Sequence, residues 1–176
     1  ITAGVDVQHD SLHVVFLGHS PTEIFALAHR VIYGDPRIDG TVWQELDEMT
    51  AATWRHPLGG ILRCDAVAVD AGDGNTADVV IDYARARIGR RVFPVKGAAG
   101  PQRAMIEKSG GKKLLFIVGV DGIKFQIMER LARGRSIRFS DTLPPQFYAE
   151  LVSEHLETKY VRGQPNRQWS RIPGRR

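Results

Sequence analysis

Two short stretches of sequence decide the fold class: TAGVDVQ at residues 2–8 and AVAVDAG at residues 66–72. Each is an apolar run of strand length that carries one carboxylate, Asp6 in the first and Asp70 in the second. A carboxylate inside or ending such a run needs a physical reason, because burying a charge is costly unless the charge is paired or binds a metal. These two aspartates are therefore the first candidates for a functional site.

The first stretch begins a series of strands. Runs of β-type sequence at residues 2–8, 12–18 and 23–33 are separated by turn residues, which predicts an antiparallel meander. Apolar residues then recur at helical spacing over residues 41–54, which predicts an amphipathic helix.

The second stretch begins a strand–helix–strand unit. A strand at residues 66–70, a helix at about 76–88 and a strand at 92–95 predict two parallel strands joined by a crossover. In that arrangement the strands of Asp6 and Asp70 lie side by side, so both carboxylates could reach one point. The remaining expected elements are a mobile loop at 97–113, a strand at 114–120, a helix capped by Asp121 and running to 133, an extended return at 135–139, a helix at 145–157 and a hairpin at 159–169 that turns at 163–166.

This order of elements is that of the ribonuclease-H-like α/β layer architecture, a mixed sheet of an antiparallel meander plus parallel strands with flanking helices. The length of 176 residues and the 43% hydrophobic content suit one domain over residues 1–176. Because the chain begins at Ile1 and not at Met, we expect it to be a piece of a longer polypeptide.

Composition excludes several classes of protein. No apolar run approaches the roughly 18 residues of a membrane helix, so we expect an intracellular protein with no membrane partner. A single cysteine, Cys64, predicts a small buried side chain and neither a disulfide nor a zinc site. The chain contains no phosphate-binding loop of the G-x-x-x-x-G-K-[ST] type, so no ATPase site is expected in it.

The net charge is only +4, but cations gather in the middle of the chain and in an acid-free, arginine-rich stretch at residues 162–176. Such patches suit a phosphate backbone, and they are equally what solvated surface looks like. The candidate DNA-binding residues are Lys96, Arg103, Lys112, Lys113, Arg167 and Arg171.

The chemistry expected at the two aspartates is that of a hard-metal site. Converging carboxylates without histidine or cysteine partners suit Mg²⁺ or Mn²⁺. Two such ions about 4 Å apart would flank a scissile phosphate, which gives phosphodiester hydrolysis. The alternative is that Asp6 and Asp70 are strand-end residues that bond to backbone N–H groups or to an arginine.

Three further residues have two interpretations each. Asp73 is a third candidate metal ligand or a helix cap, and Asp121 is a fourth candidate ligand or the cap of its own helix. Lys96 ends the strand expected beside that of Asp70, where it touches a phosphate or is simply exposed. The six histidines show no ligand spacing, so they are expected to be structural or surface residues.

Several blocks in order resemble one known family. GVDVQ with its following hairpin, YGDP at 33–36, VWQELD at 42–47, AVAVDAG, RVFPVKG at 91–97 and VGVDGIKFQIMERL together resemble the C-terminal nuclease domain of lambda-type terminase large subunits. The resemblance spans nearly the whole chain.

The resemblance implies a ribonuclease-H-like endonuclease that cuts concatemeric viral double-stranded DNA during packaging in the cytoplasm of an infected bacterium. By the family motif, Asp6 and Asp70 are its metal-binding catalytic acids. The expected partners are an ATPase domain preceding Ile1, a small terminase subunit and the portal. The family also carries a further acidic motif after the basic stretch, so the third metal ligand is expected beyond Arg176.

Two other functions remain open at this stage. One is a catalytically inactive ribonuclease-H-like module that docks DNA or the portal. The other is a resolvase or an integrase-type nuclease on the same fold, which would share the acids but lack the terminase-like blocks.

Overall fold

The computed structural model describes residues 1–100, 102–134, 136–161 and 163–174. Contacts between Cα atoms divide the chain into two compact units, Ile1–Ser140 and Asp141–Arg176. Each unit is described by itself below.

The first unit is built on an eight-stranded sheet with the order β10-β3-β2-β1-β6-β7-β9-β8. Its first three strands pair antiparallel and form the predicted meander. These strands are β1 (Thr2–Val7), β2 (Ser11–His19) and β3 (Ile24–Tyr33).

The second half of the sheet is parallel. Strand β6 (Ala66–Asp70) pairs with β1 on one side and with β7 (Val92–Ala98) on the other, both in parallel. The predicted side-by-side placement of the two aspartate strands is therefore confirmed. Strand β9 (Phe116–Gly119) continues the parallel order, β8 (Ile106–Lys108) closes that edge antiparallel, and β10 (Ile137–Phe139) closes the other edge.

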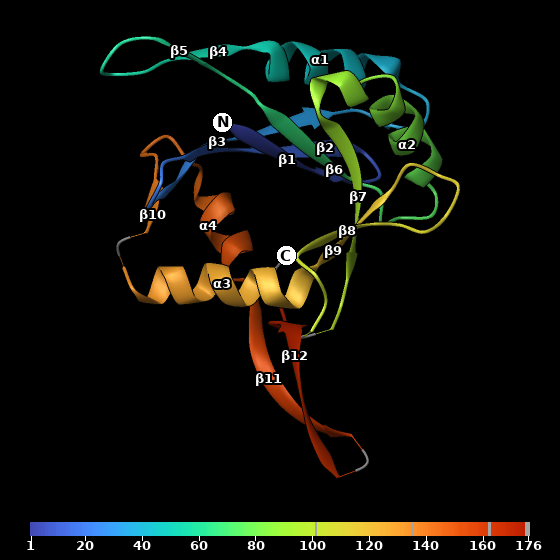
Figure 1. Cartoon of the computed structure of the whole chain (residues 1–176), viewed down its shortest axis with the longest axis vertical. Coiled ribbons are helices and arrows are strands. Elements are labelled where there is room, and N and C mark those ends of the chain that lie inside the picture. The colour runs from blue at the N-terminus through green and yellow to red at the C-terminus, as the bar shows by residue number, and fades with distance from the viewer. Residues whose placement is uncertain (101, 135, 162, 175–176) are drawn as a thin grey trace. The chain divides into compact units, whose positions relative to one another are not determined.

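Helices cover both faces of this sheet (Figure 1). Helices α1 (Gly40–Ala51) and α2 (Ala77–Arg85) lie on one face, and α3 (Val120–Ala132) lies on the other. Inward residues of β1, β2 and β6 pack with α1 and α2 into one hydrophobic core, because side chains of a strand alternate between its two faces. Among the described residues no helix is long and apolar enough to cross a membrane.

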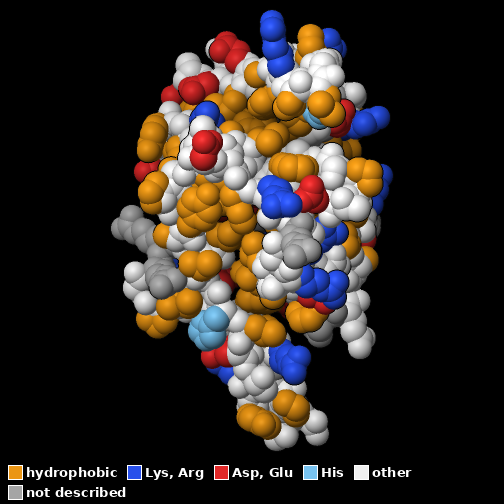
Figure 2. All heavy atoms as spheres, turned by 90° about the vertical axis from the view of Figure 1, so that its left-hand side faces the viewer, with side chains coloured by type: hydrophobic (Ala, Val, Ile, Leu, Met, Phe, Trp, Pro, Cys, Tyr) orange, Lys and Arg blue, Asp and Glu red, His pale blue; other side chains and the backbone are white. Residues whose placement is uncertain are grey.

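A second hairpin was not expected from the sequence. The predicted helix over 41–54 ends at Ala51, and β4 (Thr53–Arg55) and β5 (Ile61–Arg63) follow as an antiparallel pair. The turn between them closes where Gly59 and Gly60 adopt positive φ angles of 97° and 92°. Its surface is apolar, with Leu58 at 92% exposure, and Figure 2 shows hydrophobic side chains beside cations at that end of the molecule.

The predicted mobile loop at 97–113 was also partly wrong. Strand β7 continues to Ala98, and β8 pairs with β9 inside the segment, with Ile106 opposite Val118. Because β8 has only three residues, all of them exposed, it left no alternating apolar pattern to find.

The second unit contains α4 (Pro145–Leu151) and a hairpin of β11 (Glu154–Val161) with β12 (Gln164–Arg171). The helix predicted over 145–157 therefore ends early, since residues 154–157 belong to a strand. The predicted hairpin is confirmed, but its turn is tighter than expected, because Val161 pairs with Gln164. Proline stands in the first turn of α4, as the Pro-Pro sequence predicted.

An ion-pair network ties α1 to α2 in the first unit. The Asp47 carboxylate accepts hydrogen bonds from Arg87 Nε at 2.8 Å, from Arg90 Nη1 at 3.0 Å and from the Tyr83 hydroxyl at 3.1 Å. The Arg87 guanidinium also lies 4.0 Å from the centroid of the Tyr83 ring. Burial raises the pKa of Asp47, but the hydrogen bonds and charges of Arg87, Tyr83 and Arg90 together outweigh it and hold the pKa below the ordinary value of 3.8.

We expect Asp47→Asn to lower the free energy of unfolding at neutral pH by about 2 kcal/mol, because Arg87 loses a charged, two-pronged acceptor. A depressed folded-state pKa stabilises the native state above 3.8, and that stability is lost as the pH falls toward the folded-state pKa. Urea denaturation at pH 7 and pH 3 measures both effects. A penalty that is equal at the two pH values would contradict this assignment.

Candidate active site

The structure brings Asp6 and Asp70 together at one edge of the sheet. Strands β1 and β6 run parallel, and Val5 of β1 pairs with Val69 of β6. The next residue on each strand is the aspartate, so the two carboxylates start from neighbouring strands about 4.8 Å apart. Since Val5 and Val69 point into the core, both aspartates point to the opposite face of the sheet.

The carboxylate of Asp6 is exposed, so it does not carry the cost of a buried charge. Gly4, Asp6 and Gln8 are exposed, while Ala3, Val5 and Val7 between them are buried. Asp6 therefore belongs to the open face of an alternating strand. Its Oδ2 accepts a hydrogen bond from Gln8 Nε2 at 2.5 Å, which fixes the carboxylate without neutralising it.

Asp70 is half-buried, and its surroundings favour an added positive charge. Its Oδ1 accepts a hydrogen bond from the Gly72 N–H at 2.9 Å. Burial raises the pKa of the Asp70 carboxyl and the charge of Asp6 raises it too, against the Gly72 hydrogen bond and the charge of Lys96. Repulsion between two neighbouring carboxylates is relieved either by a proton or by a cation bound between them.

The turn after Asp70 is held by Asp73. Its Oδ1 accepts a hydrogen bond from the Asn75 N–H at 3.1 Å, and its carbonyl accepts one from the Ala77 N–H at 2.9 Å. This turn leads into α2, where Thr76 is the residue before the helix. Asp73 thus closes the turn. Its negative charge also acts on Arg37, whose pKa is raised chiefly by Asp35 and in smaller part by Asp73.

Lys96 lies in β7, next to the strand of Asp70 as predicted, but two residues before the strand ends at Ala98 and not at its end. It follows Val95, which pairs with Asp70 across β6 and β7, and its side chain is exposed. Its positive charge acts on Asp70, where it opposes the rise in pKa. Since side chains alternate along a strand, Lys96 starts from the face of Val92 and Pro94, opposite to that of Asp70.

The other predicted DNA-binding residues are distributed over several elements of both units. Arg103 Nε donates to the Ala99 carbonyl at 2.9 Å, Lys112 is exposed, and Lys113 Nζ forms an ion pair with Asp78 in the first turn of α2. Arg167 and Arg171 are exposed on β12, in the second unit.

Asp121 does not lie on a strand next to that of Asp6 or Asp70. It lies in the first turn of α3, directly after β9, and strand β7 separates β9 from β6. Helix α3 begins two residues earlier than predicted, so the helix cap is Gly119 and not Asp121. The Asp121 Oδ2 accepts a hydrogen bond from the Gly100 N–H at 2.7 Å.

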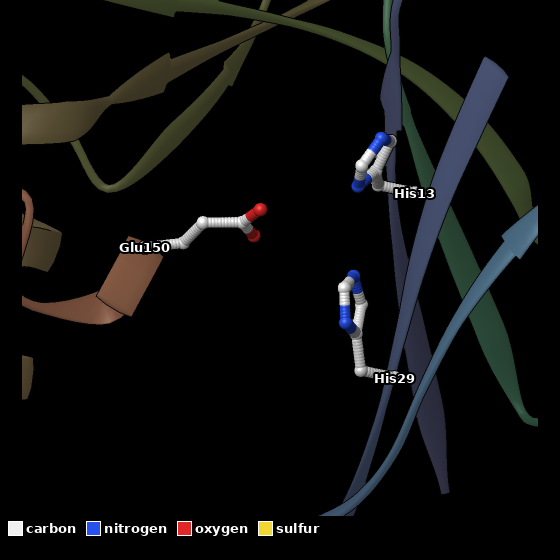
Figure 3. A group of neighbouring side chains, drawn as sticks. All are labelled: His13, His29 and Glu150. Carbon is white, nitrogen blue, oxygen red and sulfur yellow. The ribbon is translucent and has the colours of Figure 1, made fainter. Parts of the chain in front are cut away.

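Two neighbours of Asp6 were missed by the sequence analysis. Gln8 lies two residues after Asp6, just past the end of β1, and His13 of β2 pairs directly with Asp6 across the antiparallel pair. The period-two alternation and the hairpin register contain both signals. Figure 3 shows His13 with His29 of β3, whose ring centroid lies 5.7 Å away; the Glu150 drawn there belongs to the second unit.

A hard divalent cation fits the donors at the acid pair. Asp6 and Asp70 present carboxylate oxygens on one open face, and within the described part of the chain neither carboxylate has an arginine or a lysine in hydrogen-bond contact. The alternative interpretation, that Asp70 bonds to a backbone N–H, is correct in part, because Asp70 accepts a hydrogen bond from the Gly72 N–H. This bond leaves further lone pairs of the carboxylate for a ligand. Cys64 lies away from these acids, half-buried, and donates to the Ala66 carbonyl.

A mixed sheet with an antiparallel meander, parallel strands and carboxylates meeting at adjacent strand ends defines the ribonuclease-H-like class of α/β domains. Residues 1–176 match the model of the family described as terminase large subunit gpA, endonuclease domain. The chain belongs to this family, and the resemblance inferred from its sequence blocks is confirmed. Membership supports a nuclease role in DNA packaging.

The fold is also similar to a solved structure, the large terminase from the thermophilic bacteriophage D6E, with a TM-score of 0.53 and 14% identity. The similarity covers 95% of this chain and 35% of that one, so this chain spans about a third of the length of the phage protein. At this identity the likeness bears on the fold alone. No curated protein matches the chain.

Proposed function

We propose that this domain is a metal-dependent endonuclease that cuts concatemeric viral double-stranded DNA during genome packaging. The observation that carries the proposal is the juxtaposition of Asp6 and Asp70 on one open face, at the ends of parallel strands β1 and β6. Family membership supports the nuclease role, and the acid pair supplies its chemical basis.

Asp6 and Asp70 would hold Mg²⁺ or Mn²⁺, and two ions are the expected number. Divalent ions supply the charge that activates water for attack on phosphorus and stabilises the leaving oxygen. Gln8 orients the Asp6 carboxylate and the Gly72 N–H orients that of Asp70. Asp73 is the remaining candidate for a third ligand among residues 1–176.

The basic residues would hold the DNA. Lys96 follows Val95, the strand partner of Asp70, and its charge would attract the phosphate to be cut. Contacts to phosphates position a duplex but carry no sequence information, so we expect little site preference from this domain alone. The further DNA contacts that we propose are Arg103, Lys112, Lys113, Arg167 and Arg171.

The wider setting is proposed from the family. An ATPase domain of the same polypeptide, a small terminase subunit and the portal are the expected partners, in the cytoplasm of the infected bacterium. The domain organisation, with residues 1–176 as one nuclease domain, is part of the same proposal.

Metal dependence is tested by incubating the protein with supercoiled plasmid in Mg²⁺, in Mn²⁺ and in EDTA. We expect nicked and linear products with either ion and none in EDTA, because the carboxylates alone cannot activate water against a phosphodiester. Cleavage that persists in EDTA would refute a metal-dependent mechanism. Binding of the plasmid without cleavage under any metal would favour the inactive DNA-docking module.

A further inference from the structure

The segment that leads from β7 to β8 is packed tightly against the start of α3. Residues 99–105 form a loop there, called the 99–105 loop below, of which residue 101 lies outside the described residues. The loop carries Arg103, so its position decides where this cation stands, whereas Lys96 is held in β7 by its pairing with Ile117.

Two hydrogen bonds join this loop to the β9–α3 junction. The Gly100 N–H donates to Asp121 Oδ2 at 2.7 Å, and the Gly119 N–H donates to the Met105 carbonyl at 3.2 Å. Within the loop, Arg103 Nε donates to the Ala99 carbonyl at 2.9 Å. The loop is thus attached near both of its ends, at one end by a carboxylate.

The contact surface under the loop leaves no room for a side chain. A Cβ atom at Gly119 would lie 2.6 Å from the Ala104 carbonyl oxygen and 3.1 Å from Arg103 Cβ. Gly100 itself has a φ of 137°, a conformation that favours glycine. The loop therefore packs closely on the β9–α3 junction, where the Asp121 carboxylate accepts the hydrogen bond from the Gly100 N–H.

The same carboxylate is poorly placed to share an ion with Asp70. Strands β6 and β9 are separated by β7, so their backbones are about 10 Å apart across two strand spacings. Two aspartates at that separation share one ion only when both side chains extend straight toward it, and the Asp121 Oδ2 bonds instead to the Gly100 N–H. Asp6, in contrast, stands on the strand directly beside β6.

We propose that Asp121 is a positioning residue which holds the 99–105 loop, and with it Arg103, in the place where the loop contacts DNA, and that it is not a metal ligand. A negative charge in the first turn of a helix is also favourable by itself. The DNA-binding half of this inference rests on the proposed function, whereas the attachment of the loop does not.

The test compares Asp121→Asn with Asp121→Ala. A carboxamide oxygen can still accept the Gly100 N–H, but it is a weak metal ligand, so the two roles predict opposite results for the asparagine variant. Three readouts are needed: hydrogen exchange of peptides covering the loop, affinity for duplex DNA in EDTA, and plasmid cleavage with Mn²⁺. Asp82→Ala is the control, since Asp82 is an exposed acid of α2 that forms an ion pair with Arg85.

We expect Asp121→Asn to match the wild type in all three readouts. Asp121→Ala should speed exchange in the loop and weaken DNA binding in EDTA by about tenfold, with kcat for cleavage retained at saturating DNA. Gly119→Ala should reproduce the alanine phenotype, because its Cβ displaces the loop while the carboxylate stays.

Loss of cleavage in Asp121→Asn with unchanged exchange and DNA affinity would overturn the proposal and make Asp121 a metal ligand. Unchanged loop exchange in both Asp121→Ala and Gly119→Ala would overturn the attachment. Faster exchange with unchanged DNA affinity would overturn the DNA half. If the wild type neither binds nor cuts DNA, the proposed function fails, and the exchange experiment still tests the attachment.

Discussion

Asp70→Asn is expected to lower the rate of plasmid cleavage in Mg²⁺ by about a thousandfold or more, and Asp6→Asn is expected to do the same. Each change removes a negative charge from the place where the two strands bring their carboxylates together. A metal-held transition state loses about 4 kcal/mol or more when a ligand is lost, which corresponds to that factor in rate. Initial rates of nicking at saturating DNA measure the effect.

The same variants should retain their fold and their DNA affinity. The pKa of Asp70 is raised by burial and by Asp6, so the ionised carboxylate is a cost to the native state without a bound cation. Asp70→Asn should therefore melt no lower than the wild type in EDTA. Asp82→Asn is the matched control, because it removes an exposed carboxylate of α2 and should leave the rate unchanged. Full activity of Asp70→Asn would exclude the acid pair as the catalytic centre.

Phe16→Ala is expected to lower the free energy of unfolding by about 3–5 kcal/mol. Phe16 is 2% exposed in the centre of β2, and its ring centroid lies 5.2 Å from that of Trp54 in the β4–β5 hairpin. Truncation leaves a cavity in the layer between the sheet and α1, where neighbouring side chains can relax only in part. Since domains are stable by about 5–15 kcal/mol, the loss is a large fraction of the total.

Urea denaturation followed by circular dichroism measures this loss. Phe125→Ala is the control, because Phe125 of α3 is 53% exposed and the same truncation should cost about 1 kcal/mol or less. Equal destabilisation by both changes would show that the layer around Phe16 is not the core on which the first unit depends.

Periodicity in the sequence was sufficient for most strands of the main sheet and for most helices. The apolar runs of the meander and of AVAVD are long and regular, so their strands and the pairing of β1 with β6 were predicted correctly. The β4–β5 hairpin was missed because its strands have three residues each and are largely exposed, which leaves no buried face to produce an alternation. The end of α4 was missed because residues 154–157 suit a helix locally and form a strand only through β12.

The candidate site was predictable to the extent that it depends on strand pairing. Asp6 and Asp70 were found because each interrupts or ends an apolar strand, although the strand of Asp6 turned out to expose that side chain. Gln8 and His13 follow from the register of β1 with β2, a signal that was present but not used. The hydrogen bond from Gly100 to Asp121 joins residues that are 21 positions apart. It depends on the conformation of a loop, which the pattern of residues does not predict.

The most direct test of the metal centre is the anomalous difference density of crystals grown with Mn²⁺. The proposed function predicts a peak bonded to carboxylate oxygens of both Asp6 and Asp70, at about 2.1 Å, and no peak at Asp121. Mn²⁺ bound elsewhere, or no peak at the acid pair at saturating Mn²⁺, would contradict the claim that these two aspartates form the catalytic metal site.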